Sequence, residues 1–403
     1  MRLLGQDYAL QDAENNIVYP LKREAYEMVT DLSKQEHLTD SKRINMGSFY
    51  TPLRYVSLVS QWLQDEGVLD ASVFDPSCGY GAFFTLAVPK AHYDFYGNDI
   101  DGEAIKNVVE QFPNVKVFNK NIFTSITRGD FGISKDKPLI VVGNPPYNDV
   151  TSQINQKTKQ KVKVEFSPIV KTRDLGMSSL LVYNQMKADY VAVLHPLSYI
   201  IKKANFSSAK AFFHNYRLVR HIVFNSQEFT NTSKFNGFPV IVALYKRDEL
   251  NSLTYEQVQR IDFETVGGKR FSLNNWDFVA NFIDKYPNRN RYNPELLFYT
   301  MRDINALKRS RTFITQRESN AVDIDPDKLK YYCYVDCFKR YANDIPYYMG
   351  NLDVPFDYTS FHEIADDCLA ISRHYHPEVF GRHPITNAQE NSVKNYINHI
   401  IGR

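Results

Sequence analysis

An Asn-Pro-Pro-Tyr tetrad directly after an apolar run is the part of the sequence best suited to chemistry. It consists of Asn144, Pro145, Pro146 and Tyr147, and the apolar run is Leu139–Val142. The Asn144 side-chain oxygen and the Pro145 carbonyl can each accept a hydrogen bond from one planar –NH2 group. The prolines fix φ, so both acceptors are aimed in advance, and Tyr147 offers a flat face to a heteroaromatic ring. A Pro-Pro turn that only ends a strand is the structural alternative.

A second candidate site lies upstream, where a glycine-bearing turn follows a short apolar strand. The turn reads Asp75, Pro76, Ser77, Cys78, Gly79, Tyr80 and Gly81. Strand, turn and helix in this order open a doubly wound nucleotide-binding unit, and Gly79 and Gly81 let a ligand approach the backbone closely. Position 84 is Phe, so the phosphate fingerprint G-x-G-x-x-G is incomplete. Asp75 would repel a pyrophosphate but suits the cationic groups of S-adenosylmethionine. A tight turn without a ligand is the alternative.

Acidic and amide side chains follow the next two predicted strands. The residues expected at the ligand are Asp99, Ile100, Asn121 and Ile122. An acidic residue that ends the second strand is placed to hydrogen-bond ribose hydroxyls, and we assign this role to Asp99. Asp101 is expected to cap the helix that begins at residue 102 or 103. Asn121 can address an adenine amine while Ile122 and Phe123 sandwich the ring; for Asp99, a plain surface cap is the alternative.

A capped helix precedes these motifs. Its start reads Tyr50, Thr51 and Pro52, with Pro52 at the favoured first helical position and the helix expected to run to about Trp62. Thr51 and the exposed helix N-terminus form a natural carboxylate site. Taken alone, this segment indicates no more than a helix start.

In this chain order, the four motifs resemble those of the γ-class N6-adenine DNA methyltransferases of restriction–modification type. The resemblance covers about residues 40–247. It implies an α/β fold with a seven-stranded Rossmann-like methyltransferase core, S-adenosyl-L-methionine as cofactor, and double-stranded DNA whose target adenine is flipped out. It also implies direct methyl transfer to adenine N6, with Asn144 and Pro145 stabilising the charge that grows on nitrogen. A cognate restriction endonuclease encoded separately is a further implied partner.

The chain departs from the family at two places. Asn121 stands where an acidic residue is usual, which leaves the contact to the cofactor adenine open. The Lys-Pro-Gly-Gly turn common before the fifth strand is replaced by residues 187–189. The family also supplies a second aromatic side chain that stacks on the flipped base. We assign that role to Phe229, with Phe235 as the rival and an ordinary core aromatic as the alternative.

Basic residues follow two of the strands on the predicted substrate side. The formal net charge of the whole chain is only +2, so it does not itself indicate a nucleic-acid partner. The residues expected to meet DNA phosphates are Lys157, Lys159, Lys161, Lys202 and Lys203. A solvated charged surface is the alternative.

The length of 403 residues and a hydrophobic content of 43% fit two domains with sizeable cores. We expect a helical lead-in over residues 1–45, a catalytic domain over residues 46–248, and a mixed target-recognition domain over residues 249–403. The last assignment rests on position, because this region is rich in aromatic residues but carries no motif. The four cysteines lack zinc-like spacing, so no metal is expected. Without a signal peptide or long apolar run, a cytoplasmic protein with no membrane partner is expected.

Three alternative functions use the same motifs. A protein glutamine N5-methyltransferase would present the tetrad to an amide nitrogen, and an RNA adenine-N6 methyltransferase would present it to a different polymer. The Thr51-Pro52 pair and the long C-terminal region favour DNA over the protein substrate. A catalytically inactive DNA-binding subunit is the third alternative, and the intact Asp75, Asp99 and Asn144 argue against it.

Overall fold

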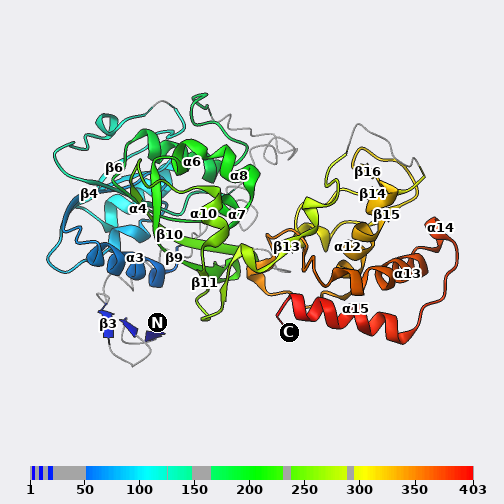
Figure 1. The fold of residues 1–403 in the computed structure, drawn as a ribbon. Helices are drawn as coiled ribbons and strands as arrows, with labels where there is room; N and C mark the ends of the chain where they lie inside the picture. Colours follow the sequence, from blue (N-terminus) through cyan, green and yellow to red (C-terminus); the bar gives the residue numbers. More distant parts are fainter. Residues whose placement is uncertain are drawn as a thin grey trace. The chain divides into compact units, whose positions relative to one another are not determined.

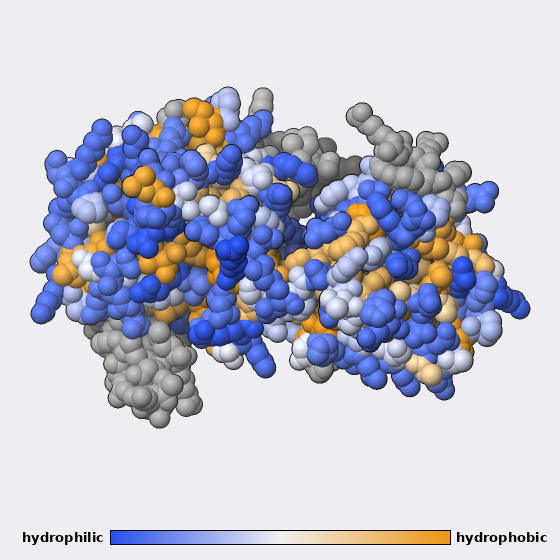
Figure 2. Space-filling model, viewed as in Figure 1, coloured by the Kyte–Doolittle hydropathy of each residue, from blue (hydrophilic) through white to orange (hydrophobic). Residues whose placement is uncertain are grey.

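The computed structural model describes residues 2–4, 9–11, 17–20, 51–124, 126–147, 165–229, 237–287 and 295–402. The chain divides into two compact units (Figure 1). The first comprises Met1–Phe235 and Val240–Phe271, and the second comprises Asn236–Pro239 and Ser272–Arg403. On the face drawn in Figure 2, hydrophilic residues cover most of both units and hydrophobic residues form scattered patches.

A seven-stranded sheet in the order β6-β5-β4-β7-β8-β10-β9 forms the centre of the first unit (Figure 1). Its strands are β4 Asp70–Asp75, β5 His92–Asn98, β6 Lys116–Phe118, β7 Leu139–Gly143, β8 Tyr190–Pro196, β9 Tyr216–Asn225 and β10 Pro239–Arg247. The pairs β4–β5, β5–β6, β4–β7 and β7–β8 are parallel, whereas β10 runs antiparallel to β8. The predicted seven-stranded α/β core is therefore confirmed.

The strand order reverses between β4 and β7. In open parallel sheets, the crevice outside the carboxyl ends of the strands at such a reversal is where ligands bind. Every residue of β7 and β8 is buried, which explains their near-continuous apolar sequences, since helices cover both faces of a parallel sheet. This arrangement brings the loops after β4, β5 and β7 to one edge.

Helices and short 3-10 turns surround the sheet. They are α3 Leu53–Asp65, η1 Ala82–Thr85, α4 Gly102–Gln111, η2 Arg128–Phe131, α6 Leu175–Gln185, α7 Ser198–Ile201, α8 Lys203–Ser208, α9 Lys210–Phe213, η3 Ser226–Glu228 and α10 Tyr255–Arg260. Pro52 lies one residue earlier than expected, at the N-cap of α3. The helix expected after the glycine turn is only the single turn η1, which begins after Gly81 in the left-handed region (φ 83°).

The boundary between the units lies later than the expected 248/249. Residues 249–271 stay with the first unit, because their hairpin of β11 Phe263–Glu264 and β12 Arg270–Phe271 attaches to the sheet. Val223 of β9 forms a bridge with Thr265, and its carbonyl accepts a 2.9 Å hydrogen bond from the Val266 N–H.

The described N-terminal residues form strands where the sequence suggested a helical lead-in. They are β1 Arg2–Leu4, β2 Ala9–Gln11 and β3 Ile17–Pro20, which make one small antiparallel sheet. β3 contains Ile, Val and Tyr in succession, and β-branched and aromatic residues favour strands. The charged remainder of the lead-in lies outside the described residues.

The second unit is a mixed α/β structure. Its strands are β13 Asp277–Phe278, β14 Leu297–Tyr299, β15 Phe313–Ile314, β16 Ala321–Asp323 and β17 Pro355–Phe356. Its helices are α11 Ile304–Leu307, α12 Leu329–Tyr341, α13 Ala365–Tyr375, α14 Pro377–Phe380 and α15 Asn387–Ile400. Its 3-10 turns are η4 Leu273–Asn275, η5 Val279–Asn281, η6 Pro326–Lys328, η7 Tyr347–Met349 and η8 Phe361–Glu363. α12, α13 and α15 pack together (Figure 1). Among the described residues, no helix is both long and apolar enough to cross a membrane.

Candidate active site at the carboxyl edge of the sheet

The loop of residues 75–81 leaves the end of β4 with its backbone donors already engaged. The Ser77 N–H donates to Asp75 Oδ1 at 3.1 Å, and the Gly79 N–H donates to Asp99 Oδ2 at 2.8 Å. The Cys78 N–H donates to the Asn98 carbonyl at 2.9 Å. The sequence suggested N–H groups aimed at a ligand, but these N–H groups hold the loop itself. Two of their acceptors are the acidic side chains Asp75 and Asp99.

Asp75 and Asp99 are two acidic groups that form no ion pair within the described residues, and Asp75 is only 2% exposed. Burial, reinforced by the charge of Asp99, raises the pKa of Asp75 well above its ordinary value. Burial also raises the pKa of Asp99, although hydrogen bonds from the Asp101 and Gly79 N–H groups oppose the shift. Such a pair favours a ligand that brings positive charge.

Asp99 joins two loops through both carboxylate oxygens. Its Oδ1 accepts from the Asp101 N–H at 2.9 Å, while its Oδ2 accepts from Gly79. Asp101 is the N-cap of α4 as predicted, since its Oδ1 accepts from the Glu103 N–H at 3.0 Å. Ile100, between the two acids, is 53% exposed and leaves an apolar surface at this edge.

Asn98 connects three loops and was not singled out by the sequence reasoning. It is fully buried at the end of β5. Its amide nitrogen donates to the Pro76 and Lys120 carbonyls, each at 3.0 Å, and its oxygen accepts from the Lys120 N–H at 2.9 Å. This side chain holds together the segments that follow β4, β5 and β6.

The amide of Asn121 is engaged within the protein. Its oxygen accepts from the Phe123 N–H at 3.0 Å, and its nitrogen donates to the Glu165 carbonyl at 2.9 Å. Ile122 is buried. Phe123 stacks on Phe166, with 4.9 Å between ring centroids and 25° between planes. Asn121 thus ties two loops together beside the predicted adenine site, and Phe166 is an aromatic neighbour that the sequence did not indicate.

The Asn-Pro-Pro-Tyr tetrad leaves β7 directly against the acidic loop. A Cβ at Gly143, the residue before Asn144, would lie 3.3 Å from Asp75 Oδ1 and 3.5 Å from the Tyr183 hydroxyl. Pro145 is buried, whereas Asn144, Pro146 and Tyr147 are half-buried. The structure therefore brings the predicted amine-binding motif and the predicted cofactor loop together.

Tyr147 is anchored through its hydroxyl. That group donates to the Leu194 carbonyl of β8 at 3.2 Å and also contacts Asn144 Oδ1. Burial, with added repulsion from the charges of Tyr183 and Asp174, raises the pKa of Tyr147 well above its ordinary value, so the phenol stays neutral.

Phe229 lies beside Tyr147, with 6.3 Å between ring centroids and 48° between planes. It is 1% exposed and packs on Phe224 at 5.4 Å. Phe224 in turn stacks on Tyr55 of α3 at 4.2 Å. The neighbouring Glu228 accepts from the Tyr55 hydroxyl and pairs with Arg54. The first turn of α3 therefore holds the segment that carries Phe229.

A buried polar cluster supports this edge of the sheet. His195 is fully buried at the end of β8, and burial lowers its pKa to about 4. Its Nδ1–H donates to the Pro196 carbonyl at 2.9 Å, so its Nε2 accepts from the Tyr245 hydroxyl at 2.9 Å. Tyr199 stacks on His195 at 5.3 Å and donates to Asp174, the N-cap of α6. These partners are distant in sequence, so no local pattern could have identified them.

The remaining predicted residues fall into two groups. Thr51 is buried next to the N-cap of α3; Lys202 and Lys203 lie where α7 meets α8, after β8, with Lys202 half-buried and Lys203 exposed. The predicted residues outside the described ones are Tyr50, Lys157, Lys159, Lys161 and Phe235. Among the described residues, no cluster of His, Cys, Asp and Glu is placed to hold a metal ion.

Comparisons with known proteins point to one family. A family model described as "N-6 DNA Methylase" matches residues 24–289. The "Type I restriction enzyme MjaIX methylase subunit" of Methanocaldococcus jannaschii is 32% identical over 112 residues, which cover 26% of this chain and 19% of that protein. The "Type II methyltransferase M.HincII" of Haemophilus influenzae is 28% identical over 112 residues, which cover 27% of this chain and 19% of that protein. The match thus spans about a fifth of the length of these curated relatives.

Solved structures resemble the chain more distantly. The N-methyltransferase NodS from Bradyrhizobium japonicum, solved with S-adenosyl-L-homocysteine, is 12% identical with a TM-score of 0.32, and the match covers 57% of this chain and 100% of that one.

Proposed function

The chain belongs to the N-6 DNA methylase family, and from this membership we propose that it is a site-specific DNA adenine-N6 methyltransferase that uses S-adenosyl-L-methionine. One observation carries the proposal. A Cβ at Gly143, the residue before the Asn144 tetrad, would lie 3.3 Å from Asp75 Oδ1, so an amine acceptor site and a cation-binding loop share one edge of the sheet.

The residues present fit the proposed cofactor. Two carboxylates, Asp75 and Asp99, share one loop region, with Asp75 almost fully buried, and have no ion-pair partner among the described residues, so a cationic ligand would remove an electrostatic cost. Asp99 would hold the ribose with its remaining lone pairs, and Ile100 would cover the adenine ring. Thr51 and the N-terminus of α3 would hold the carboxylate. When bound, S-adenosyl-L-methionine supplies a methyl group on a sulfonium.

Asn144 and Pro145 carry the acceptor side of the reaction. Adenine N6 is a poor nucleophile because its lone pair is delocalised into the ring. Two acceptors aimed at the –NH2 group favour a more tetrahedral nitrogen and stabilise the positive charge that develops on it. The fixed φ of the prolines means that no reorganisation is needed at that moment. The released proton passes to water.

Tyr147 and Phe229 would hold the flipped base between them. Extracting a base from the duplex costs a few kcal/mol, which stacking on aromatic rings offsets. Two stacked contacts of about 3.5 Å each need rings about 7 Å apart and parallel. The observed rings are 6.3 Å apart and tilted by 48°, so Phe229 must move slightly as the base enters.

The wider roles follow from the same proposal. The second unit would read the target sequence, and Lys202 and Lys203 would contact phosphates beside the catalytic edge. Membership of a restriction–modification system, with a separately encoded endonuclease, is part of the proposal because one named relative is the methylase subunit of a type I restriction enzyme.

Nucleoside analysis of methylated polymers tests the proposed reaction. Purified protein is incubated with S-adenosylmethionine and, separately, with plasmid DNA, transcribed RNA and a protein mixture. N6-methyladenine in the DNA alone supports the proposal. Transfer only to RNA adenine or to a glutamine side chain contradicts it, and binding of DNA without any transfer indicates an inactive subunit.

A further inference from the structure

Two hollows of the second unit flank one short basic segment, residues 309–313. The first has a volume of about 360 Å³, and its lining includes Arg311, Thr312, Asp336, Lys339, Arg340 and His376. The second has a volume of about 470 Å³, and its lining includes Tyr286, Tyr299, Arg302 and Arg309. Five Lys and Arg side chains line the hollows together, against two carboxylates, Asp336 and Glu378.

The two hollows belong to one continuous surface. Tyr299 lines the second hollow, and the Arg311 guanidinium of the first lies 4.9 Å from the centre of its ring. The Tyr299 N–H also donates to the Thr312 carbonyl at 2.8 Å, which fixes β14 against the segment between the hollows. A chain-like ligand can therefore pass from one hollow to the other along this segment.

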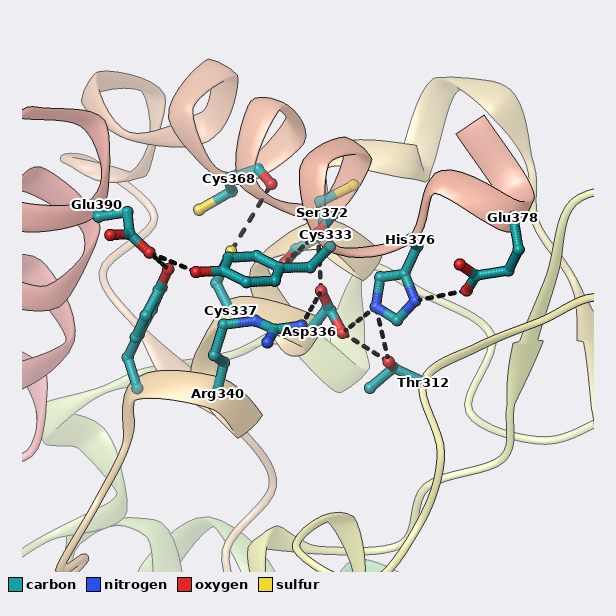
Figure 3. Close-up of polar contacts among 12 residues, drawn as sticks. Thr312, Cys333, Asp336, Cys337, Arg340, Cys368, Ser372, His376, Glu378 and Glu390 are labelled. Carbon is teal, nitrogen blue, oxygen red and sulfur yellow. Dashed lines mark hydrogen bonds and ion pairs between the residues drawn. The ribbon is translucent and has the colours of Figure 1, made fainter. Parts of the chain in front are cut away.

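The interior carboxylate of the first hollow is fully engaged (Figure 3). Asp336 accepts from the Thr312 hydroxyl at 2.5 Å, the Ser372 hydroxyl at 3.1 Å and His376 Nε2 at 2.9 Å. Burial opposes its ionisation, but the hydrogen bond and charge of His376 lower the pKa of Asp336 below its ordinary value. Its negative charge is thus matched inside the fold and does not repel an anion at the mouth.

The cations of this surface differ in their pairing: Arg311 pairs with Glu318 at 2.6 Å, and Arg340 lies 4.0 Å from Asp336. Lys339 and the side chain of Arg302 form no hydrogen bond or ion pair with any residue that the structure describes. The Nε of Arg340 is buried without a hydrogen-bond partner among the described residues, while its guanidinium lies 3.7 Å from the centre of the Tyr375 ring. Burial lowers the pKa of Lys339, and the charge of Arg340 adds to that effect. The unpaired charges of Lys339 and Arg302 favour an anionic ligand at this surface.

We propose that this basic face, defined by Arg302, Arg309, Arg311, Lys339 and Arg340, binds consecutive phosphates of a double-stranded DNA backbone. The inference deepens the proposed function and rests on it. Guanidinium groups pair with phosphate oxygens in a fork geometry, and a row of cations beside aromatic rings suits a sugar-phosphate chain better than a single small anion. Such contacts set the register of a reading domain without carrying sequence information.

Charge-removing variants test the basic face. Lys339→Ala, Arg302→Ala and the double variant are compared with the wild type for binding to a labelled duplex over a series of salt concentrations. The matched control is Lys330→Ala: Lys330 lies on the same helix, α12, nine residues earlier and therefore on the opposite side. We expect each test variant to weaken binding equally for target and non-target duplexes. The salt slope should fall by about one in each single variant and by about two in the double variant, with the control unchanged.

The outcomes separate the inference from the proposed function. One outcome is that the wild type binds and methylates DNA while the double variant keeps the wild-type affinity and salt slope. In that case the basic face does not bind the DNA phosphates, and the proposed function stands. If the variants lose affinity for an RNA duplex and not for DNA, the assignment to DNA is wrong. If the wild type neither binds nor methylates DNA, the proposed function fails and the inference with it. Thermal unfolding curves show whether each variant is folded.

Discussion

Asp75 is a buried carboxyl group that nothing in the described part of the chain compensates with positive charge. Burial raises its pKa well above the ordinary 3.8. An acid whose pKa is raised on folding stabilises the protein fully below its ordinary pKa, and this stability is lost as the pH rises through the raised value. A cationic cofactor reverses the effect because it pairs with the ionised form.

The affinity for S-adenosylmethionine should therefore depend on pH. We expect the dissociation constant to rise as the pH falls through the raised pKa of Asp75, since the protonated acid cannot pair with a cation. Asp75→Asn should bind weakly at every pH and flatten the profile. Calorimetric titration at several pH values measures this, with Asp136→Asn, an exposed acid of the same unit, as control. A profile identical in Asp75→Asn and wild type would contradict the proposed role.

Tyr147 is expected to act through its ring more than through its hydroxyl. Tyr147→Ala removes a stacking surface worth about 1–3 kcal/mol, so the KM for DNA should rise roughly 5- to 150-fold. Tyr147→Phe keeps the ring and loses the contacts of the hydroxyl with Asn144 Oδ1 and the Leu194 carbonyl, at about 1 kcal/mol for each hydrogen bond. Steady-state kinetics and 2-aminopurine fluorescence at the target base report the two effects. Equal losses in both variants would indicate that the hydroxyl, and not the ring, matters.

At the scale of elements, the link between α3 and η3 positions Phe229. Glu228 accepts from Tyr55 and pairs with Arg54, and Arg54 is about a third exposed, so the ion pair itself contributes little. Glu228→Ala removes the acceptor of the Tyr55 hydroxyl, so it should loosen Phe229 and raise the KM for DNA by roughly 5-fold, about 1 kcal/mol, without changing cofactor affinity. Glu103→Ala, which removes an exposed pair with Lys106, is the control. A change in cofactor affinity alone would argue against this positioning role.

The sheet and the ends of its strands are the parts of the structure that local sequence patterns predict well. Buried parallel strands are short apolar runs, and here β4 ends at Asp75, directly before Pro76, and β7 ends at Gly143. The cap at Asp101 follows the same local chemistry and is observed. These features depend on neighbours in sequence, which is why the sequence alone could identify them.

The sequence reasoning missed or misplaced features that depend on contacts between residues far apart in the chain. Asn98 looks like any strand-end amide, and its three hydrogen bonds appear only when the loops converge. His195 is hidden in an apolar strand, and its partner Tyr245 lies on β10. The apolar residues after Gly81 suggested a helix, but the chain makes one 3-10 turn, whose C-cap Leu86 is extended. Local propensity is a weak guide where tertiary packing decides.

At the scale of the whole molecule, we expect the stability of the second unit to depend on pH through a group of its own. His376 is held between Asp336 at 2.9 Å and Glu378 at 3.1 Å, with Arg340 on the other side of Asp336. Burial opposes its protonation, but the hydrogen bond and charge of Asp336 raise its pKa above the ordinary 6.5. The stabilisation of the fold by protonated His376 should therefore be fully present below pH 6.5. It should be lost as the pH rises through the raised pKa of His376.

Urea unfolding curves between about pH 6 and about pH 9 measure this loss. The chain has two tryptophans, so a Trp62→Phe background leaves Trp276, in the second unit, as the fluorescent reporter. His376→Gln should lower stability at acidic pH and flatten its decline, whereas the exposed His362→Gln should not. An unchanged decline in His376→Gln would show that another group is responsible.

The sequence reasoning expected three segments, residues 1–45, 46–248 and 249–403, whereas the structure divides into two compact units. The sequence placed the boundary after the last core strand, at 248/249, because the residues beyond that strand carry no motif. The hairpin that pairs with β9 extends the first unit to Phe271, and that pairing is a tertiary contact. The function of the second unit stays a proposal, because groove contacts have no sequence signature.

The most direct test of the account is single-molecule sequencing of plasmid DNA from a methylation-free host that expresses the chain, beside a host that expresses Asn144→Ala. Full N6-methyladenine at one short recurrent sequence is predicted for the wild type. Removing one preorganised group of this kind costs about 100- to 1,000-fold in rate, so the variant should leave nearly all sites unmodified. Equal modification by the variant would contradict the role of Asn144, and unmodified DNA from a wild-type protein that binds S-adenosylmethionine would contradict the DNA substrate.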